Sequence, residues 1–199
     1  MMTLRLKTLL ISALLCVGAV SPSRAEMAPL PAYGSDKAPY SFMVWGTFTC
    51  AFTRKIMPVL KQIVDESNGK VKLEWHHYPA HPPDPALHVL ALTDPAHFWE
   101  FTFAFLRALD AQPNHRDYNS LAKATAEKAG IDLAKFAAAE DDPAKWDAVK
   151  QDFLAGHLLG VRFTPGIFFD GYFLTPKGLP VDTEAFEVSL RTMVQQAKH

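Results

Sequence analysis

The pattern of hydrophobic and polar positions begins with a strand, a helix and a second strand. The first strand is a continuous hydrophobic run, Tyr40 to Thr47, of the kind that a strand covered on both faces needs. From Cys50 the hydrophobic residues take helical spacing, at Ile56, Val59, Leu60, Ile63 and Val64. We expect Thr49 to cap this helix and Val71 to Tyr78 to form the second strand. A β-α-β order implies that the two strands are parallel.

A long helical block follows, and the chain then returns to strand. Alanines and spaced hydrophobic residues predict helical stretches at 85–93, 95–110, 116–129, 132–139 and 143–159. Two further hydrophobic runs, Gly166 to Asp170 and Tyr172 to Leu174, meet at Asp170-Gly171, which is a strong hairpin signal. Asp182 to Gln196 closes the chain as an amphipathic helix. The order predicts an α/β, thioredoxin-like fold with a helical insertion between the βαβ half and the β-hairpin-α half.

The first residues of the chain have the pattern of a secretory signal peptide. Arg5 and Lys7 precede a hydrophobic run, Leu9 to Val20, and Ser23 and Ala25 supply small residues for cleavage before Glu26. A run of roughly a dozen hydrophobic residues is too short to span a bilayer, which needs about 20. We therefore predict a signal peptide at 1–25, an extended segment at 26–39 and one domain at 40–199, with its insertion at about 84–159. The expected location is the periplasm, with no membrane attachment of the mature form.

Removal of the signal peptide changes the charge and the cysteine count. The full chain of 199 residues has 20 basic residues, 21 acidic residues and 2 cysteines. Three basic residues and Cys16 leave with residues 1–25, so 17 basic residues face 21 acidic ones, a formal charge of −4. A mildly acidic chain without a basic tract gives no support for nucleic-acid binding. Cys50 is left as a lone thiol in an exported protein, and this marks it as a reactive or intermolecular-pairing candidate.

Cys50 lies where a strand ends and a helix begins. The free N–H groups and the dipole of a helix N-terminus favour a negatively charged thiolate. Thr53 occupies the position three residues later, where a dithiol redox protein has its second cysteine. Its hydroxyl can donate a hydrogen bond to the sulfur but cannot form a disulfide. Such a thiolate can form a mixed disulfide, or a sulfenic acid, that an outside thiol resolves; a buried, inert thiol is the alternative.

Several motifs resemble the DsbA-type branch of the thioredoxin superfamily. FTCAFTRK is similar to the F-x-C-x-x-C motif of these thiol–disulfide oxidoreductases, and LGVRFTPGIFFDGYFL to their later G-V-x-x-T-P-x-F-F-x-x-G. Between these motifs, His97-Phe98-Trp99-Glu100 resembles the family's F-W segment, and Gly130-Ile131-Asp132 its G-[LI]-D. The motifs occur in the order and at the spacing of the family, and the resemblance covers nearly the whole mature chain.

The resemblance implies a role for each matching position. Cys50 would be the attacking cysteine, and Pro165 a cis-proline that faces it. The backbone of Thr164 would then pair with an extended substrate peptide, and Ala51 and Phe52 would complete the substrate-binding surface. From the residues alone, Pro165 is equally compatible with an ordinary trans-proline at a strand start. The chain departs from the family at Thr53, which argues against donation of a disulfide held within the chain.

Other polar and aromatic groups have competing interpretations. Four histidines, at 76, 77, 81 and 88, suggest metal, but adjacent histidines on a strand point to opposite faces and no acid or cysteine completes a familiar ligand set. We expect these histidines to be polar residues of strand ends and loops, with no metal site. The aromatic residues between Phe98 and Phe105 favour burial over a peptide-binding surface. Glu74 is expected at the surface, with a buried acid as the alternative.

Three functions remain open from the sequence. The first is an exported thiol–disulfide oxidoreductase that acts through Cys50 alone on disulfide-bearing proteins, unfolded proteins or small thiols. It would need no bound cofactor, with glutathione or another low-molecular-weight thiol as resolving partner. The second is a redox-silent peptide-binding module or chaperone that retains the proline groove. In the third, another protein supplies the missing thiol.

Overall fold

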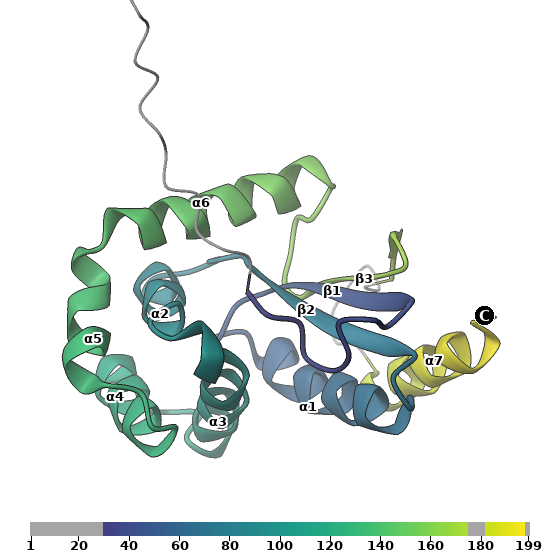
Figure 1. Ribbon diagram of the computed structural model, residues 1–199, viewed down its shortest axis with the longest axis horizontal. Helices are drawn as coiled ribbons and strands as arrows, with labels where there is room; N and C mark the ends of the chain where they lie inside the picture. The colour runs from purple at the N-terminus through teal and green to yellow at the C-terminus, as the bar shows by residue number, and fades with distance from the viewer. Residues whose placement is uncertain (1–29, 175–181, 198–199) are drawn as a thin grey trace, which may run out of the picture.

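A four-stranded sheet in the order β2-β1-β3-β4 lies at the centre of the protein (Figure 1). The structure is a computed structural model that describes residues 30–174 and 182–197, so the predicted signal peptide lies outside the described residues. β1 (Tyr40–Gly46) pairs in parallel with β2 (Val71–His77) and antiparallel with β3 (Gly166–Phe169). β3 continues through a hairpin into β4 (Tyr172–Phe173). The predicted parallel pair and hairpin are both confirmed.

Helices cover both faces of this sheet. α1 (Ala51–Glu66) joins β1 to β2, and α7 (Thr183–Gln196) lies beside α1 on the same face (Figure 1). α6 (Pro143–Leu158) runs along the opposite face. Within residues 30–174 and 182–197, no helix is both long enough and hydrophobic enough to cross a membrane.

The predicted helical block lies between β2 and β3; its helices from α2 to α5 gather at one end of the sheet, and α6 returns along the sheet face (Figure 1). Its elements agree with the predicted stretches to within a few residues: α2 (Asp84–Ala91), the 3₁₀ turn η1 (Pro95–His97), α3 (Phe98–Ala111), α4 (Tyr118–Lys128), α5 (Leu133–Ala138), the 3₁₀ turn η2 (Ala139–Asp141) and α6. Aspartate side chains accept hydrogen bonds from the first N–H groups of α4, α5, α6 and α7. These caps satisfy donors that have no partner inside the helix and so fix where each helix starts.

Successive side chains of β1 point to opposite faces of the sheet, so the hydrophobic core has two parts. Phe42 and Val44 are fully buried on the α1 face, in a cluster that continues into α3. On the opposite face Trp45 packs with Tyr78, Val161 and Phe168 beneath α6. The aromatic residues of α3 belong to the first part, because Phe98, Phe101, Phe103 and Phe105 are all buried. Burial, the favoured interpretation, is confirmed for the four phenylalanines, whereas Trp99 is only partly buried and donates its indole N–H to the backbone oxygen of Pro31.

α6 approaches the sheet closely at Gly156. A methyl group at this position would overlap the indole ring of Trp45. One turn earlier, the Trp45 indole N–H donates a hydrogen bond to the backbone oxygen of Asp152, with the two atoms 3.2 Å apart. The small residue and the hydrogen bond together allow the helix backbone to lie directly on the tryptophan ring.

Candidate active site

The connection between β1 and α1 places Cys50 at the N-terminus of α1. Cys50 is itself the N-cap residue, with φ −72° and ψ 122°, and it is partly exposed. The predicted cap, Thr49, is wrong: the helix begins one residue later, and the buried Thr49 hydroxyl has no hydrogen-bond partner among the residues that the structure describes. The first turn of α1 contains no acidic residue. The positive end of the helix dipole therefore faces the sulfur with no acidic side chain in the first turn beside it.

Sheet pairing brings a distant loop against this cysteine. β1 pairs with β3 so that Trp45 lies opposite Gly166, and the residues just before β3 therefore lie beside the start of α1. The Cys50 thiol donates a hydrogen bond to the backbone oxygen of Thr164, with sulfur and oxygen 3.4 Å apart. The peptide bond between Thr164 and Pro165 is cis. Cys50, Thr164 and Pro165 thus come together although more than a hundred residues separate them.

Thr53 does not have the hydrogen bond expected of it. Its side chain is completely buried, and its hydroxyl has no hydrogen-bond partner in the described part of the chain. The hydrogen bond that this hydroxyl could donate to the Cys50 sulfur is therefore not formed. The thiol is oriented toward the carbonyl of Thr164 instead. The Thr53 methyl group packs close to Gly46 at the end of β1, so the residue fills the space behind the turn.

Of the two residues between Cys50 and Thr53, one faces solvent and the other faces the core. Ala51 is exposed. Phe52 is buried and packs against Phe186 of α7, with ring centroids 6.1 Å apart. Its side chain therefore contributes to the interface between α1 and α7 and is not available at the rim of the site, contrary to the expectation that it meets the substrate.

Arg54 is a residue of this site that the sequence did not single out. Its guanidinium Nη1 donates to the backbone oxygen of Thr49 over 2.7 Å, although the side chain retains only 13% exposure. Asp110 of α3 lies 3.8 Å from its Nε. A basic residue in the first turn of a helix is usually exposed to solvent, so no sequence pattern indicated a role for Arg54. In the structure α3 packs beside Arg54, whose side chain turns back toward Thr49, the residue before Cys50.

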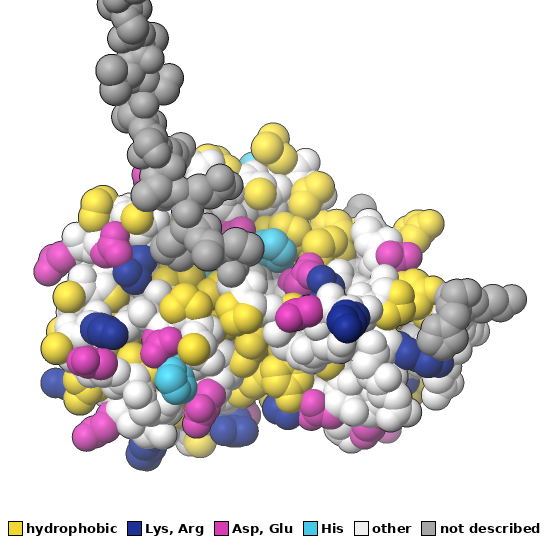
Figure 2. Space-filling model, in the orientation of Figure 1, with side chains coloured by type: hydrophobic (Ala, Val, Ile, Leu, Met, Phe, Trp, Pro, Cys, Tyr) yellow, Lys and Arg dark blue, Asp and Glu magenta, His cyan; other side chains and the backbone are white. Residues whose placement is uncertain are grey.

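Exposed hydrophobic side chains lie close to the Thr164 loop. Phe163 and Phe173 are 38% and 40% exposed, with ring centroids 6.1 Å apart. A second exposed group lies at the C-terminal end of α6, where Figure 2 shows hydrophobic side chains gathering; it comprises Leu154, Leu158 and Leu159. The surface near Cys50 therefore offers hydrophobic contacts on the side of the loop and the hairpin.

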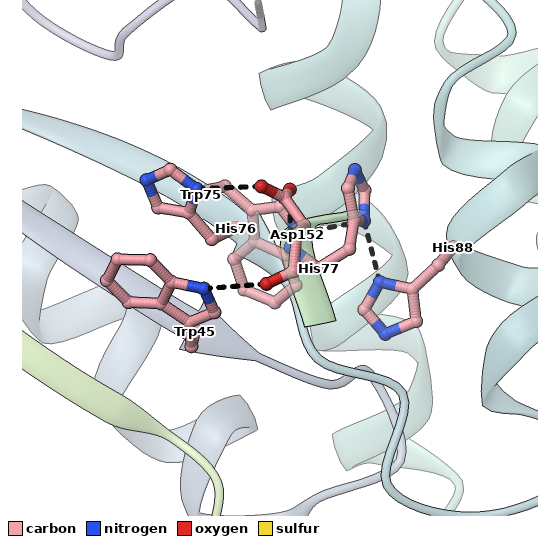
Figure 3. A network of polar contacts seen from close by, with 6 residues as sticks. All are labelled: Trp45, Trp75, His76, His77, His88 and Asp152. Atoms are coloured by element: carbon pink, nitrogen blue, oxygen red, sulfur yellow. Dashed lines mark hydrogen bonds and ion pairs between the residues drawn. The ribbon is translucent and has the colours of Figure 1, made fainter. Parts of the chain in front are cut away.

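The histidines fall into two groups on opposite faces of β2. His76 is partly exposed, stacks on Trp45 and contacts the carboxylate of Asp152, with Nδ1 and Oδ1 3.1 Å apart. His77 faces the other way and is buried against His88 of α2 (Figure 3). The expected split of the adjacent pair is confirmed, and His77 does lie at the end of its strand. His88 lies inside α2 and not in a loop, and both His77 and His88 are buried where α2 packs near the end of β2. In residues 30–174 and 182–197, no three His, Cys, Asp or Glu side chains gather in a way that could hold a metal ion.

Glu74, the other polar residue considered on β2, is only partly exposed. Its carboxylate pairs with Lys72 across 2.7 Å. This pair lies on the same strand, two residues apart, and is remote in sequence from the Cys50 turn.

Comparison with known proteins identifies the family. The thioredoxin family model matches residues 27–186. Because this match spans well over half of the chain, the protein belongs to the thioredoxin family. Comparison with curated proteins finds no match.

Several solved structures share the fold. BdbD from Bacillus subtilis in its oxidised form is 16% identical, with a TM-score of 0.67 over 83% of this chain and 93% of that one. The thiol-disulfide exchange protein alpha-DsbA2 from Wolbachia pipientis is 19% identical, with a TM-score of 0.66 over 84% and 86%. DsbA2 from Pseudomonas aeruginosa is 18% identical, with a TM-score of 0.60 over 87% and 98%. These similarities confirm the predicted thioredoxin-like fold with its helical insertion.

Proposed function

We propose that this protein is an exported thiol–disulfide exchange protein that acts through Cys50 alone. The observation that carries the proposal is the placement of the Cys50 sulfur: partly exposed, at the N-terminus of α1, and 3.4 Å from the backbone oxygen of Thr164. A helix N-terminus stabilises the thiolate, which is the nucleophile in disulfide exchange. The family membership and the DsbA-type motifs support the same chemistry.

The exchange has two balanced steps. The Cys50 thiolate attacks one sulfur of a substrate disulfide, so that a mixed disulfide forms and the other substrate sulfur leaves as a thiolate. A second thiolate from outside the chain then attacks the mixed disulfide, regenerates the Cys50 thiolate and takes over the substrate sulfur. The predicted mature chain has no second cysteine, and Thr53 occupies the position at which a dithiol protein has its resolving cysteine.

Small thiols and disulfide-bearing proteins are the proposed reactants. Glutathione or another low-molecular-weight thiol would resolve the mixed disulfide, unless a partner protein supplies the thiol. A protein substrate would lie along Thr164 and Pro165 in an extended conformation, with Ala51 and the exposed Phe163 and Phe173 nearby. The reaction needs no bound cofactor.

Export rests on the sequence pattern of residues 1–25. A basic start, a short hydrophobic run and small residues before Glu26 favour secretion to the periplasm, where disulfides persist. N-terminal sequencing of the protein from the periplasmic fraction of an expressing bacterium should begin at Glu26. A protein that retains Met1 in the cytoplasm argues against export.

A redox-silent peptide-binding module is the second candidate. It is favoured by the exposed pair Phe163 and Phe173 next to the Thr164 loop, and by the loss of a resolving cysteine at Thr53. This candidate predicts that replacement of Cys50 by serine leaves peptide binding and any chaperone activity unchanged. The first candidate predicts that the same replacement abolishes exchange.

Trapping of a mixed disulfide tests the leading proposal. The protein is treated with glutathione disulfide, and intact-mass spectrometry under non-reducing conditions should show one added glutathione on nearly every molecule. The matched control is the Cys50→Ser variant, which should stay unmodified. A wild-type mass without the adduct, together with a freely alkylated thiol after unfolding, contradicts the proposal.

A further inference from the structure

Two buried histidines join the helical insertion to the end of the sheet. His77, the last residue of β2, and His88 of α2 place their Nδ1 atoms 2.7 Å apart (Figure 3). Their exposed fractions are 2% and 0%. Aromatic rings enclose the pair: Trp75 and Phe48 pack against His88, and Phe98 packs against His77. The contact is therefore a polar link inside a hydrophobic environment.

Both imidazoles are neutral near pH 7. Burial lowers the pKa of His77 to about 4; the charge of Asp152 on α6 raises it and that of His76 lowers it further, and burial prevails. Burial also lowers the pKa of His88 well below 6.5, and the neighbouring His77 adds to this effect. Asp84, the buried carboxylate in the first turn of α2, accepts a hydrogen bond from the backbone N–H of His81.

The pair is also hydrogen-bonded to its neighbours. The indole N–H of Trp75 donates to His77 Nδ1, with Nε1 and Nδ1 3.3 Å apart. On the other side of the pair, His88 Nε2 and the Thr47 hydroxyl oxygen lie 3.3 Å apart, and they share a hydrogen bond in either tautomer of His88 because a hydroxyl can donate or accept. The polar contacts therefore connect Thr47 to His88 and His88 to His77.

Thr47 belongs to the connection that carries Cys50. It is completely buried and lies three residues before the cysteine, and the next residue, Phe48, packs on the His88 ring with centroids 5.0 Å apart. His88 thus contacts two of the four residues between β1 and α1. The third residue, Thr49, accepts a hydrogen bond from Arg54, and the fourth, Cys50, donates one to the Thr164 carbonyl. The buried histidine is therefore one of the groups that hold this connection in place.

We propose that His88 is a positioning residue for Cys50, which acts through the Thr47 hydroxyl to hold the β1–α1 connection against the insertion. The consequence for disulfide exchange rests on the function proposed above; the effect on the connection itself does not. Loss of the Thr47 hydrogen bond loosens residues 47–50. Cys50 then spends less time at the helix N-terminus and reacts more slowly with disulfides.

Replacement of Thr47 provides the test because one buried hydroxyl can be removed. Thr47→Val replaces this hydroxyl with a methyl group and keeps the branched side chain, whereas Thr47→Ser keeps the hydroxyl. Thr102→Val is the matched control, since Thr102 is also completely buried but its hydroxyl has no hydrogen-bond partner in the described part of the chain. His88→Leu serves as a second variant if it folds. Amide hydrogen exchange of residues 47–54 and the rate of Cys50 with glutathione disulfide at pH 7 are measured for each.

The two measurements separate this inference from the proposed function. We expect Thr47→Val to speed amide exchange of residues 47–54 at least fivefold and to slow disulfide exchange at least threefold, with Thr47→Ser and Thr102→Val close to wild type. Wild-type protection of these amides in Thr47→Val overturns the inference even if Cys50 is highly reactive. A wild-type Cys50 that does not react, with loosened amides in Thr47→Val, instead overturns the proposed function and leaves the positioning role supported.

Discussion

Among individual side chains, those around Cys50 have different roles. The thiol faces the Thr164 carbonyl, Thr53 fills the space behind the turn, and Arg54 donates to the carbonyl of Thr49 from a mostly buried position. Arg54 adds a positive charge within one turn of the sulfur and restrains the peptide that precedes it. Both effects bear on the position and the electrostatic surroundings of the sulfur.

Replacement of Arg54 should slow the reaction of Cys50 with disulfides. Arg54→Met removes the guanidinium and its hydrogen bond, and we expect the rate at pH 7 to fall about fivefold, the equivalent of about 1 kcal/mol. Arg54→Lys retains the charge but not the hydrogen-bond geometry of the guanidinium, and its rate should lie between those of the wild type and Arg54→Met. Stopped-flow measurement with glutathione disulfide checks this. Arg107→Met, an exposed position on α3, is the control; equal rates for the Arg54→Met and Arg107→Met variants would show that Arg54 has no role.

Among the helices, the contact of α6 with the sheet depends on a single small residue. Gly156 lies against the Trp45 ring, and the indole N–H bonds the α6 backbone four residues earlier. The carboxylate of Asp152 also accepts from His76 Nδ1 and from the backbone N–H of His77. One face of α6 is thus fastened to β1 and to the end of β2.

Gly156→Ala should therefore destabilise the fold despite the better helix propensity of alanine. The added methyl overlaps Trp45, so α6 or the indole must move, at a cost of about 1–3 kcal/mol against a gain of about 1 kcal/mol in propensity. Urea unfolding followed by tryptophan fluorescence measures the net change. Ala155→Gly, at the exposed neighbouring position, reports the propensity effect alone. A Gly156→Ala protein more stable than wild type contradicts the close packing described above.

The folded protein as a unit should lose stability in mild acid because of its buried histidine. His77 has a pKa of about 4 when folded and about 6.5 when unfolded. The unfolded chain therefore takes up a proton between pH 6.5 and 4 that the folded chain does not. Stability is fully present above pH 6.5 and falls by on the order of 3 kcal/mol as the pH drops to about 4. His88, whose pKa is also lowered, acts in the same direction.

Chemical unfolding at a series of pH values measures this loss. Asp152 does not account for it: burial raises its pKa, but the hydrogen bond with His76 and the nearby histidine charges lower it below 3.8 overall, so its effect lies at lower pH. The His77→Gln variant should show a shallower decline, and His81→Gln, at an exposed position, should follow wild type. A wild-type stability that stays flat from pH 6.5 to 4 would count against a neutral, buried pair.

Local patterns were enough to predict the order of strands and helices, because periodicity reports which face of each element is buried. The contact between Cys50 and the Thr164 loop came from motif resemblance, since no local pattern links residues so far apart. The contacts of His88 and Arg54 were not predicted, for a common reason. Each depends on how an insertion helix packs, α2 over His77 and α3 beside Arg54, and a polar residue on a helix gives no sign of such a neighbour.

The reactivity of Cys50 in the folded protein, compared with the same thiol in the unfolded chain, tests the central claim most directly. The second-order rate constant with glutathione disulfide is measured at pH 7 for the native protein and for the protein in urea. If the helix N-terminus and the Thr164 loop prepare the sulfur for exchange, the native rate should exceed the unfolded rate at least tenfold. A native rate equal to or below that of the unfolded chain would contradict a redox role for this site.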